Sequence, residues 1–426
     1  MSLTESSALR DAPPSWIEER RRAAFAAFDG AAMPSETEEV WRYVDLGFDV
    51  SDYQLAEGGA EALPADAVLG NEIGHAAGTA TVIDGATTDV RSDAPDGVVF
   101  ESVAKAVVSH ETMLQEVYGK GIPVDLDKLA AAHHAFSTDG VVLYVPPATA
   151  VTQPFVIDVQ ATRPGAVSFP HVTVVVEESS QASVVVNNRS ADGTGALVVP
   201  QIELYVRDNA RLDMSVVQNW DYSSTALAHG RAVVGRDATL RLAEAGLGGE
   251  LSRFHLMVDL VGRGAHAEIL GAYFGEQEQT LDYRYFMNHA APNTTSEMFL
   301  KGAVEDEALS VFTGMIRIEE EAQRTNAHQT NRNLILSDGA RAQSVPNLEI
   351  LANDVRCGHG STVGPLEDEQ RYYLMSRGID RPRADRLQVR GFFEEAIGRF
   401  PHPGLAGPLR EWINAKYVNA QEEGRV

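Results

Sequence analysis

The chain has 426 residues, which exceeds the roughly 250–300 residues at which a single hydrophobic core usually stops growing. The sequence therefore predicts several domains or an elongated repeat. Its 61 acidic residues outnumber 35 lysines and arginines, for a net charge of −26, and only five of the basic residues are lysines. An acidic, lysine-poor surface favours solubility at high salt, so we expect a halophilic protein that does not bind nucleic acid.

The expected compartment follows from three further features. The first residues lack a basic start followed by an apolar segment, so no secretion signal is expected. No apolar run approaches the roughly 20 residues that a membrane helix requires, which predicts no membrane association. A single cysteine, Cys357, excludes an intramolecular disulfide and indicates a reducing, cytoplasmic location.

Residues 1–136 predict an N-terminal domain of helices and short strands. Apolar residues recur near one face over 15–30, as in an amphipathic helix, and 99–136 show helical patterns again. Between them, 55–98 are rich in alanine, glycine and aspartate and contain only short strand-like runs. We expect this region to precede a different architecture.

From 137 to 364, short segments alternate apolar and polar residues with period two, the mark of strands with one buried face. A turn followed by alanine recurs at steps of 28, 28 and 27 residues, at Ala182, Ala210, Ala238 and Ala265. Periods of this size are typical of stacked coils that cannot bury their faces singly. The sequence therefore predicts a mainly β fold with a parallel β-helix core.

Residues 365–426 predict a C-terminal helical domain. Two apolar stripes with helical spacing run through 389–400 and 409–417. We expect the stripes to pack on each other, and a surface for a partner is the alternative.

Cys357 and His359 are the strongest candidate site residues. Two residues apart on a strand, they would project from the same face and present a thiolate and an imidazole together. Iron, zinc and copper prefer such ligands, but two ligands do not close a four-coordinate site. The alternative is an inert buried cysteine beside a structural histidine.

Other chemistry finds little support in the sequence. No glycine-rich loop with Lys-Ser or Lys-Thr is present, so we expect no nucleotide to bind this chain. Gln323, Gln329, Asn331 and Asn333 alternate, which predicts a stacked polar ladder of structural importance. A carbohydrate-active β-helix enzyme would require clustered carboxylates and stacking aromatic residues, and no such cluster stands out. We expect a scaffold and no catalytic residues.

Several segments together resemble the SufB/SufD family of iron–sulfur cluster assembly proteins. The similar segments lie at 312–318, 322–334, 346–350, 354–360, 362–364 and 369–379. The early segment 38–43, the Cys-x-His-Gly pattern and the modest length are most like SufD. The extra cysteines expected of SufB are missing.

This resemblance implies a right-handed parallel β-helix that pairs with SufB, and a C-terminal helical domain, 365–426, that docks the SufC ATPase. Cys357 and His359 match positions implicated at the SufB–SufD interface, where they would contribute ligands to iron or a nascent iron–sulfur cluster shared with the partner. A SufB-like paralogue, a purely structural SufC adaptor without a metal role and a homodimer are the alternatives.

Overall fold

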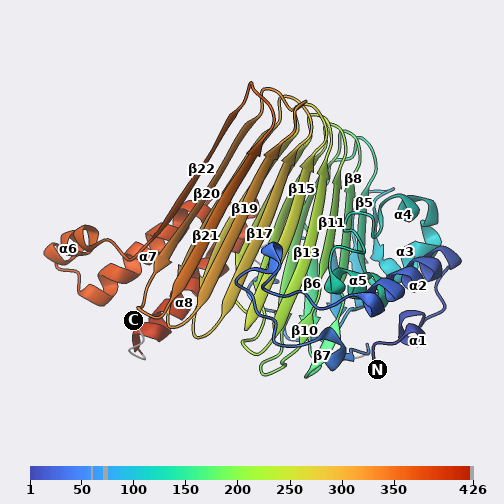
Figure 1. Cartoon of the computed structure of the whole chain (residues 1–426), viewed down its shortest axis with the longest axis horizontal. Coiled ribbons are helices and arrows are strands. Elements are labelled where there is room, and N and C mark those ends of the chain that lie inside the picture. Colours follow the sequence, from blue (N-terminus) through green and yellow to red (C-terminus); the bar gives the residue numbers. More distant parts are fainter. Residues whose placement is uncertain (59–60, 71–74, 423–426) are drawn as a thin grey trace.

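The computed structural model describes residues 1–58, 61–70 and 75–422. Its body is a parallel β-solenoid of about eight turns, in which the chain passes alternately through two long sheets (Figure 1). Helices lie at both ends of the chain. The mainly β fold with a β-helix core, an N-terminal mixed region and C-terminal helices is confirmed.

Sheet A contains every second strand of the solenoid, and sheet B contains the strands between them. In spatial order, sheet A is formed by β4 (Val99–Ser102), β5 (Gly140–Val145), β8 (His171–Val176), β11 (Gln201–Val206), β13 (Thr225–Val234), β15 (Leu251–Leu260), β17 (Thr280–His289), β19 (Leu309–Ile318) and β21 (Arg341–Ile350). Three short strands join sheet A at its side: β1 (Gln54–Leu55), β7 (Ala166–Ser168) and β10 (Leu197–Val198).

Sheet B runs in the same direction along the solenoid. Its strands in order are β3 (Ala86–Ser92), β2 (Gly78–Ile83), β6 (Phe155–Ala161), β9 (Gln181–Ser190), β12 (Arg211–Asn219), β14 (Thr239–Gly246), β16 (His266–Gly275), β18 (Thr295–Val304), β20 (Asn326–Ile335) and β22 (Arg356–Gly364). Because β2 pairs with β6, and β4 pairs with β5, part of residues 1–136 continues the two sheets. The division of the chain at 136 and 364 stays a prediction.

Several successive coils turn from sheet A into sheet B through a residue in the left-handed backbone region. The angle φ is 56° at Asn209, 53° at Asp237 and 76° at Gly264, and these residue types adopt that region most readily. The alanines that follow the first two, Ala210 and Ala238, are buried, because only a small side chain fits inside the corner.

The predicted repeat is offset at its first member. Ala182 pairs with Leu212, two positions beyond Ala210, and Ser180 takes the corner position in that coil. The predicted first step of 28 residues therefore does not correspond to one coil. The later alanines do mark successive corners.

The space between the two sheets is filled by inward-facing apolar side chains from every coil. On β14, for example, Leu240 and Leu242 are fully buried in this interior, whereas Ala243 and Ala245 face the opposite way. Each fully buried leucine or valine stabilises the fold by about 1.5–3 kcal/mol, and stacking the coils makes this burial continuous.

The N-terminal helices lie at the end of the solenoid where the first coils form (Figure 1). They are α1 (Glu5–Ala8), α2 (Ser15–Gly30), α3 (Val103–Ser109), α4 (Glu111–Val117) and α5 (Lys128–Phe136), with 3-10 turns at Glu39–Trp41 and Val50–Asp52. At this end, β3 and β4 pair antiparallel with their neighbours and close the two sheets.

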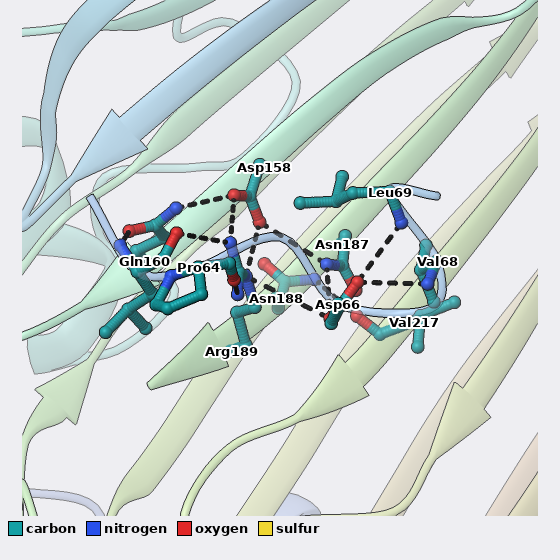
Figure 2. A network of polar contacts seen from close by, with 11 residues as sticks. Pro64, Asp66, Val68, Leu69, Asp158, Gln160, Asn187, Asn188, Arg189 and Val217 are labelled. Carbon is teal, nitrogen blue, oxygen red and sulfur yellow. Dashed lines mark hydrogen bonds and ion pairs between the residues drawn. The ribbon is translucent and has the colours of Figure 1, made fainter. Parts of the chain in front are cut away.

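A segment before β2 is fixed to the outer face of sheet B by a polar network (Figure 2). Arg189 on β9 donates to both carboxylate oxygens of Asp158 on β6, at 2.9 and 2.7 Å, and also to the carbonyl oxygen of Pro64. The carboxylate of Asp66 accepts from the amide of Asn187 at 3.0 Å and from the backbone N–H of Val68 at 3.0 Å. These buried, charge-assisted contacts hold the segment in place.

The C-terminal helices are α6 (Asp368–Ser376), α7 (Arg381–Ile397) and α8 (Ala406–Glu422), with a 3-10 turn at Pro403–Leu405. The apolar stripes of α7 and α8 pack on each other, as predicted, through residues such as Phe393 and Ile413. Both stripes also cover the outer face of sheet B at Leu270 and Phe274. Their positions are therefore fixed by the solenoid as well.

Candidate functional site

The last coil of the solenoid leaves both sheets with an open edge. β21 pairs only with β19, and β22 pairs only with β20, so each ends its sheet in the described part of the chain. An open edge carries backbone donors and acceptors that can pair with a strand of another molecule. Pro346 in β21 fits this position, because proline within sheets is found mainly on edge strands.

Cys357 and His359 both lie on β22, opposite Ala327 and Gln329 of β20. Those two β20 residues are fully buried in the solenoid interior. The register therefore places Cys357 and His359 on the same, inward face, at the coil where that interior opens to solvent. Cys357 is half-buried against the core, and His359 is exposed.

A thiolate and an imidazole are groups that can bind a metal ion, but two of them do not complete a four-coordinate site. Burial raises the pKa of the Cys357 thiol, while the backbone N–H of Gly358 opposes this shift. The thiol therefore holds its proton at neutral pH and needs a cation to become a good ligand. Within the described residues, no three His, Cys, Asp or Glu side chains gather closely enough to hold a metal ion. Further ligands would have to come from another molecule.

Polar side chains line the interior behind this open coil. The hydroxyl of Tyr273 donates to Asn333 Oδ1 at 2.6 Å, and the amides of Asn331 and Asn333 donate to Tyr273 Oη and Asn331 Oδ1, at 3.0 and 2.7 Å. Gln329 donates to a backbone carbonyl of β21, but its Oε1 is buried without a hydrogen-bond partner. The three amide side chains form a row along one strand, β20, and not the predicted ladder stacked from coil to coil, because their neighbours on β18 are Met298, Leu300 and Gly302. Gln323 lies outside the row, in the turn before β20.

Deeper in the interior, Glu244 of β14 is almost fully buried among apolar and aromatic side chains. Its carboxyl group accepts a hydrogen bond from the hydroxyl of Tyr285. Burial raises the pKa of Glu244 to about 8, and the hydrogen bond from Tyr285 only partly offsets this. A carboxyl group inside a β-helix was not indicated by the sequence, because Glu244 stands in an alternating strand like many surface residues.

The open coil also exposes apolar side chains. Ile350 is 41% exposed, Leu351 47% and Val363 44%, and all three lie at the ends of the last two strands. Nearby, α6 buries none of its residues and projects beyond β22 (Figure 1). Tyr372 on α6 is 76% exposed. Helical and strand periodicity can be recognised in this part of the sequence, but the periodicity does not indicate which faces stay uncovered.

Two family models match adjoining parts of the chain. Residues 3–157 match the SufBD protein N-terminal region, and residues 157–392 match the SufBD core domain of the SUF system for iron–sulfur cluster assembly. Together they span the N-terminal region, the whole solenoid and most of α7.

Curated relatives cover most of the chain as well. A SufBD family protein of iron–sulfur cluster assembly from Mycobacterium tuberculosis is 33% identical over 91% of this chain and 90% of its own length. The iron–sulfur cluster assembly protein SufD of Bacillus subtilis is 31% identical over 75% of this chain and 74% of its own. A chloroplast protein of Arabidopsis thaliana named ABCI7 is 30% identical over 78% and 72%. The chain therefore belongs to the SufBD family of iron–sulfur cluster assembly proteins.

Proposed function

We propose that this chain is a SufD-like scaffold subunit that pairs with SufB through the open coil and contributes ligands to a nascent iron–sulfur cluster. The observation that carries the proposal is the position of Cys357 and His359 on the inner face of the terminal strand β22. A soft ligand pair too small to hold iron is useful there, because a second solenoid on this edge would bring the missing ligands. Iron and sulfide are the cargo of this scaffold.

The open edge is an argument for a partner that is itself a β-helix. Two strand edges and the apolar rim formed by Ile350, Leu351 and Val363 are arranged around the same coil. Backbone pairing along such edges gives affinity, and apolar side chains add buried area. A second copy of this chain presents the same edge, so a homodimer is the alternative when SufB is absent.

The uncovered helix α6 supports docking of the SufC ATPase at residues 365–426. Tyr372 and Tyr373 are 76% and 58% exposed, and Leu387 on α7 is 41% exposed. Exposed aromatic residues grouped on one element are typical of protein interfaces. In this assembly the ATPase would supply the hydrolysis, and the present chain would bind no nucleotide.

The resemblance to the Bacillus subtilis SufD supports the SufD-like assignment over the SufB-like one. The single cysteine supports it too, because a SufB-like subunit would need more thiol ligands. One free thiol and no possible intramolecular disulfide also support a reducing, cytoplasmic compartment. Within the described residues, no helix combines the length and apolar character needed to cross a bilayer.

The test is cluster reconstitution with the assembled complex. His359→Ala and Cys357→Ala variants are co-purified with SufB and SufC and supplied with ferrous iron and sulfide without oxygen. We expect His359→Ala, and to a smaller extent Cys357→Ala, to lower the bound iron and sulfide while the complex keeps its size. His328→Ala is the matched control, because His328 is exposed on the opposite face, beside Gly358.

Two of the alternatives, the structural adaptor and the SufB-like paralogue, predict a different outcome of this experiment. Unchanged iron and sulfide in the double variant, with SufC still bound, would support the structural adaptor. A cluster formed by this chain and SufC without SufB would support the SufB-like paralogue. Either result would overturn the proposed ligand role at the shared interface.

A further inference from the structure

A cavity of about 300 Å³ lies between α2, α5 and the loop 118–124, at the end of the solenoid opposite the open coil. Arginine, lysine and histidine residues line it, together with Tyr118 and Ser137. No aspartate or glutamate lines this cavity in the described part of the chain. That absence is informative in a protein with a net charge of −26, because its surface is acidic elsewhere.

Arg21 in the cavity wall is a buried cation without a counterion. The residue is 6% exposed, and its one hydrogen bond joins Nη1 to the carbonyl oxygen of Arg10 at 3.5 Å. It forms no ion pair within the described ranges. The other buried arginines, Arg189, Arg253 and Arg284, each pair with a buried aspartate. A buried charge without a partner costs several kcal/mol, so an anion is the missing element.

Nearby charges do not replace that anion. Burial and the neighbouring Arg21 lower the pKa of Arg10 to about 10, so a second cation adds repulsion. Asp11 is 3.7 Å from Arg10 Nε, but its side chain is 72% exposed and screened by water. The buried carboxylate of Glu203 accepts from the backbone N–H groups of Gly119 and Gly121 and from His171, so it is already satisfied.

Lys120 gives a second, independent observation. The other four lysines form ion pairs with carboxylates, namely Lys105 with Glu101, Lys128 with Asp49, Lys301 with Glu395 and Lys416 with Glu276. Lys120 lines the cavity, is exposed and has no ion pair among the residues that the structure describes. Arg20 also lines the cavity without an ion pair among the described residues, but its guanidinium group donates to the carbonyl oxygens of Tyr118 and Gly119. Arg21 and Lys120 therefore face the same space with fewer partners than the other cations of the wall.

The histidines of the wall are held in place by hydrogen bonds. His133 Nδ1 lies 2.8 Å from the carbonyl oxygen of Val199, so this nitrogen donates. Burial lowers the pKa of His133 well below its ordinary value, which keeps the ring neutral and makes Nε2 the acceptor for His171 Nδ1 at 3.0 Å. His171 then directs its other nitrogen at Glu203, 3.1 Å away. These partners fix the rings as rigid walls of the cavity.

We propose that this cavity binds a small phosphate-type anion, held by Arg21 and Lys120 with the hydroxyls of Tyr118 and Ser137 as further partners. The positive charges of Arg21 and Lys120 together match the charge of a phosphate monoester, about −1.5 to −2 at neutral pH. The guanidinium group suits two phosphate oxygens at once, and the lysine adds a point charge. The volume admits more than inorganic phosphate, so the source is either free phosphate or a small phosphorylated molecule.

The experiment measures binding of inorganic phosphate and of glycerol 3-phosphate to the full chain. Unfolding midpoints are followed as each is added, with potassium chloride keeping the ionic strength constant. We expect a saturable rise for the wild type and a loss of at least about tenfold in affinity for Arg21→Gln, since a charge-assisted hydrogen bond is removed. Tighter binding of glycerol 3-phosphate identifies a phosphorylated molecule, and equal binding identifies free phosphate.

Arg22→Gln is the matched control, because Arg22 is the next residue on α2 but pairs with Glu5 and Glu18 on the exposed face. It should bind phosphate like the wild type. If Arg21→Gln does not fold, the exposed Lys120→Gln variant gives the same comparison by equilibrium dialysis. No phosphate effect beyond that of chloride in the wild type, or equal affinity in the cavity and control variants, would overturn the proposal.

Discussion

The buried carboxyl group of Glu244 should make the stability of the solenoid depend on pH. Its pKa is about 8 in the folded chain, against an ordinary value of 4.5. Between these values the folded chain holds one proton that the unfolded chain has released. The stability contributed by the neutral carboxyl is therefore present at low pH and is lost as the pH rises toward about 8.

The size of the effect follows from the shift. Between the unfolded and the folded pKa, each pH unit changes the free energy of unfolding by about 1.4 kcal/mol for one proton. From about pH 6 to about pH 9, the wild type should lose about 2–3 kcal/mol relative to Glu244→Gln. The glutamine keeps an oxygen that can accept from the hydroxyl of Tyr285 and cannot ionise.

The assay is urea unfolding of both proteins across this pH range at one salt concentration. Taking the difference between the two curves cancels the titration of the buried histidines, which both proteins share. Glu278→Gln is the control, because Glu278 is exposed in a turn and has water around its carboxylate. Parallel pH profiles for wild type and Glu244→Gln would refute the reasoning, since they would mean that Glu244 is already ionised in the fold.

Three further changes test the open coil and the core. Replacing Ile350 and Val363 by alanine should weaken binding to SufB about 30-fold, measured by sedimentation, since each substitution loses about 1 kcal/mol of buried apolar surface. Val108→Ala is the control, because Val108 is 71% exposed on α3, and it should not change the binding. Gly302→Ala should lower the free energy of unfolding by at least about 2 kcal/mol, because the added Cβ would clash with the buried ring of Tyr273. An unchanged midpoint of urea unfolding would contradict this expectation. Tyr372→Ala should change stability by less than about 0.5 kcal/mol yet reduce the SufC that co-purifies, and equal recovery of SufC would argue against docking on α6.

The solenoid could be predicted from the sequence because the sequence signals of a solenoid are local. Alternation along each strand and a small residue at each corner repeat from coil to coil, and both reflect the chain's immediate neighbours. The same-face placement of Cys357 and His359 follows from the geometry of one strand. The offset at Ala182 shows the limit, because coil length varies and only pairing with Leu212 fixes the register.

What the sequence could not predict depends on contacts between distant segments. Glu244 looks like a surface residue until the neighbouring coils enclose it. Arg21 sits in a run of three arginines, whose sequence alone does not distinguish their surroundings, yet Arg20 and Arg21 turn toward the loop 118–124 and only Arg22 stays exposed. Whether a charge is paired is decided by tertiary packing, so composition alone gives no signal for the cavity.

The two ends of the solenoid differ in a way that bears on the proposed function. Antiparallel strands and helices close the first coils, whereas the last coil keeps two free edges and a half-buried thiol. A partner that covers β22 would remove the remaining water from Cys357 and raise its pKa further, unless a metal ion enters and displaces the proton. Under the proposed function, a partner that supplies the missing ligands would favour metal binding at this edge, and by reciprocity the bound metal would favour docking of that partner.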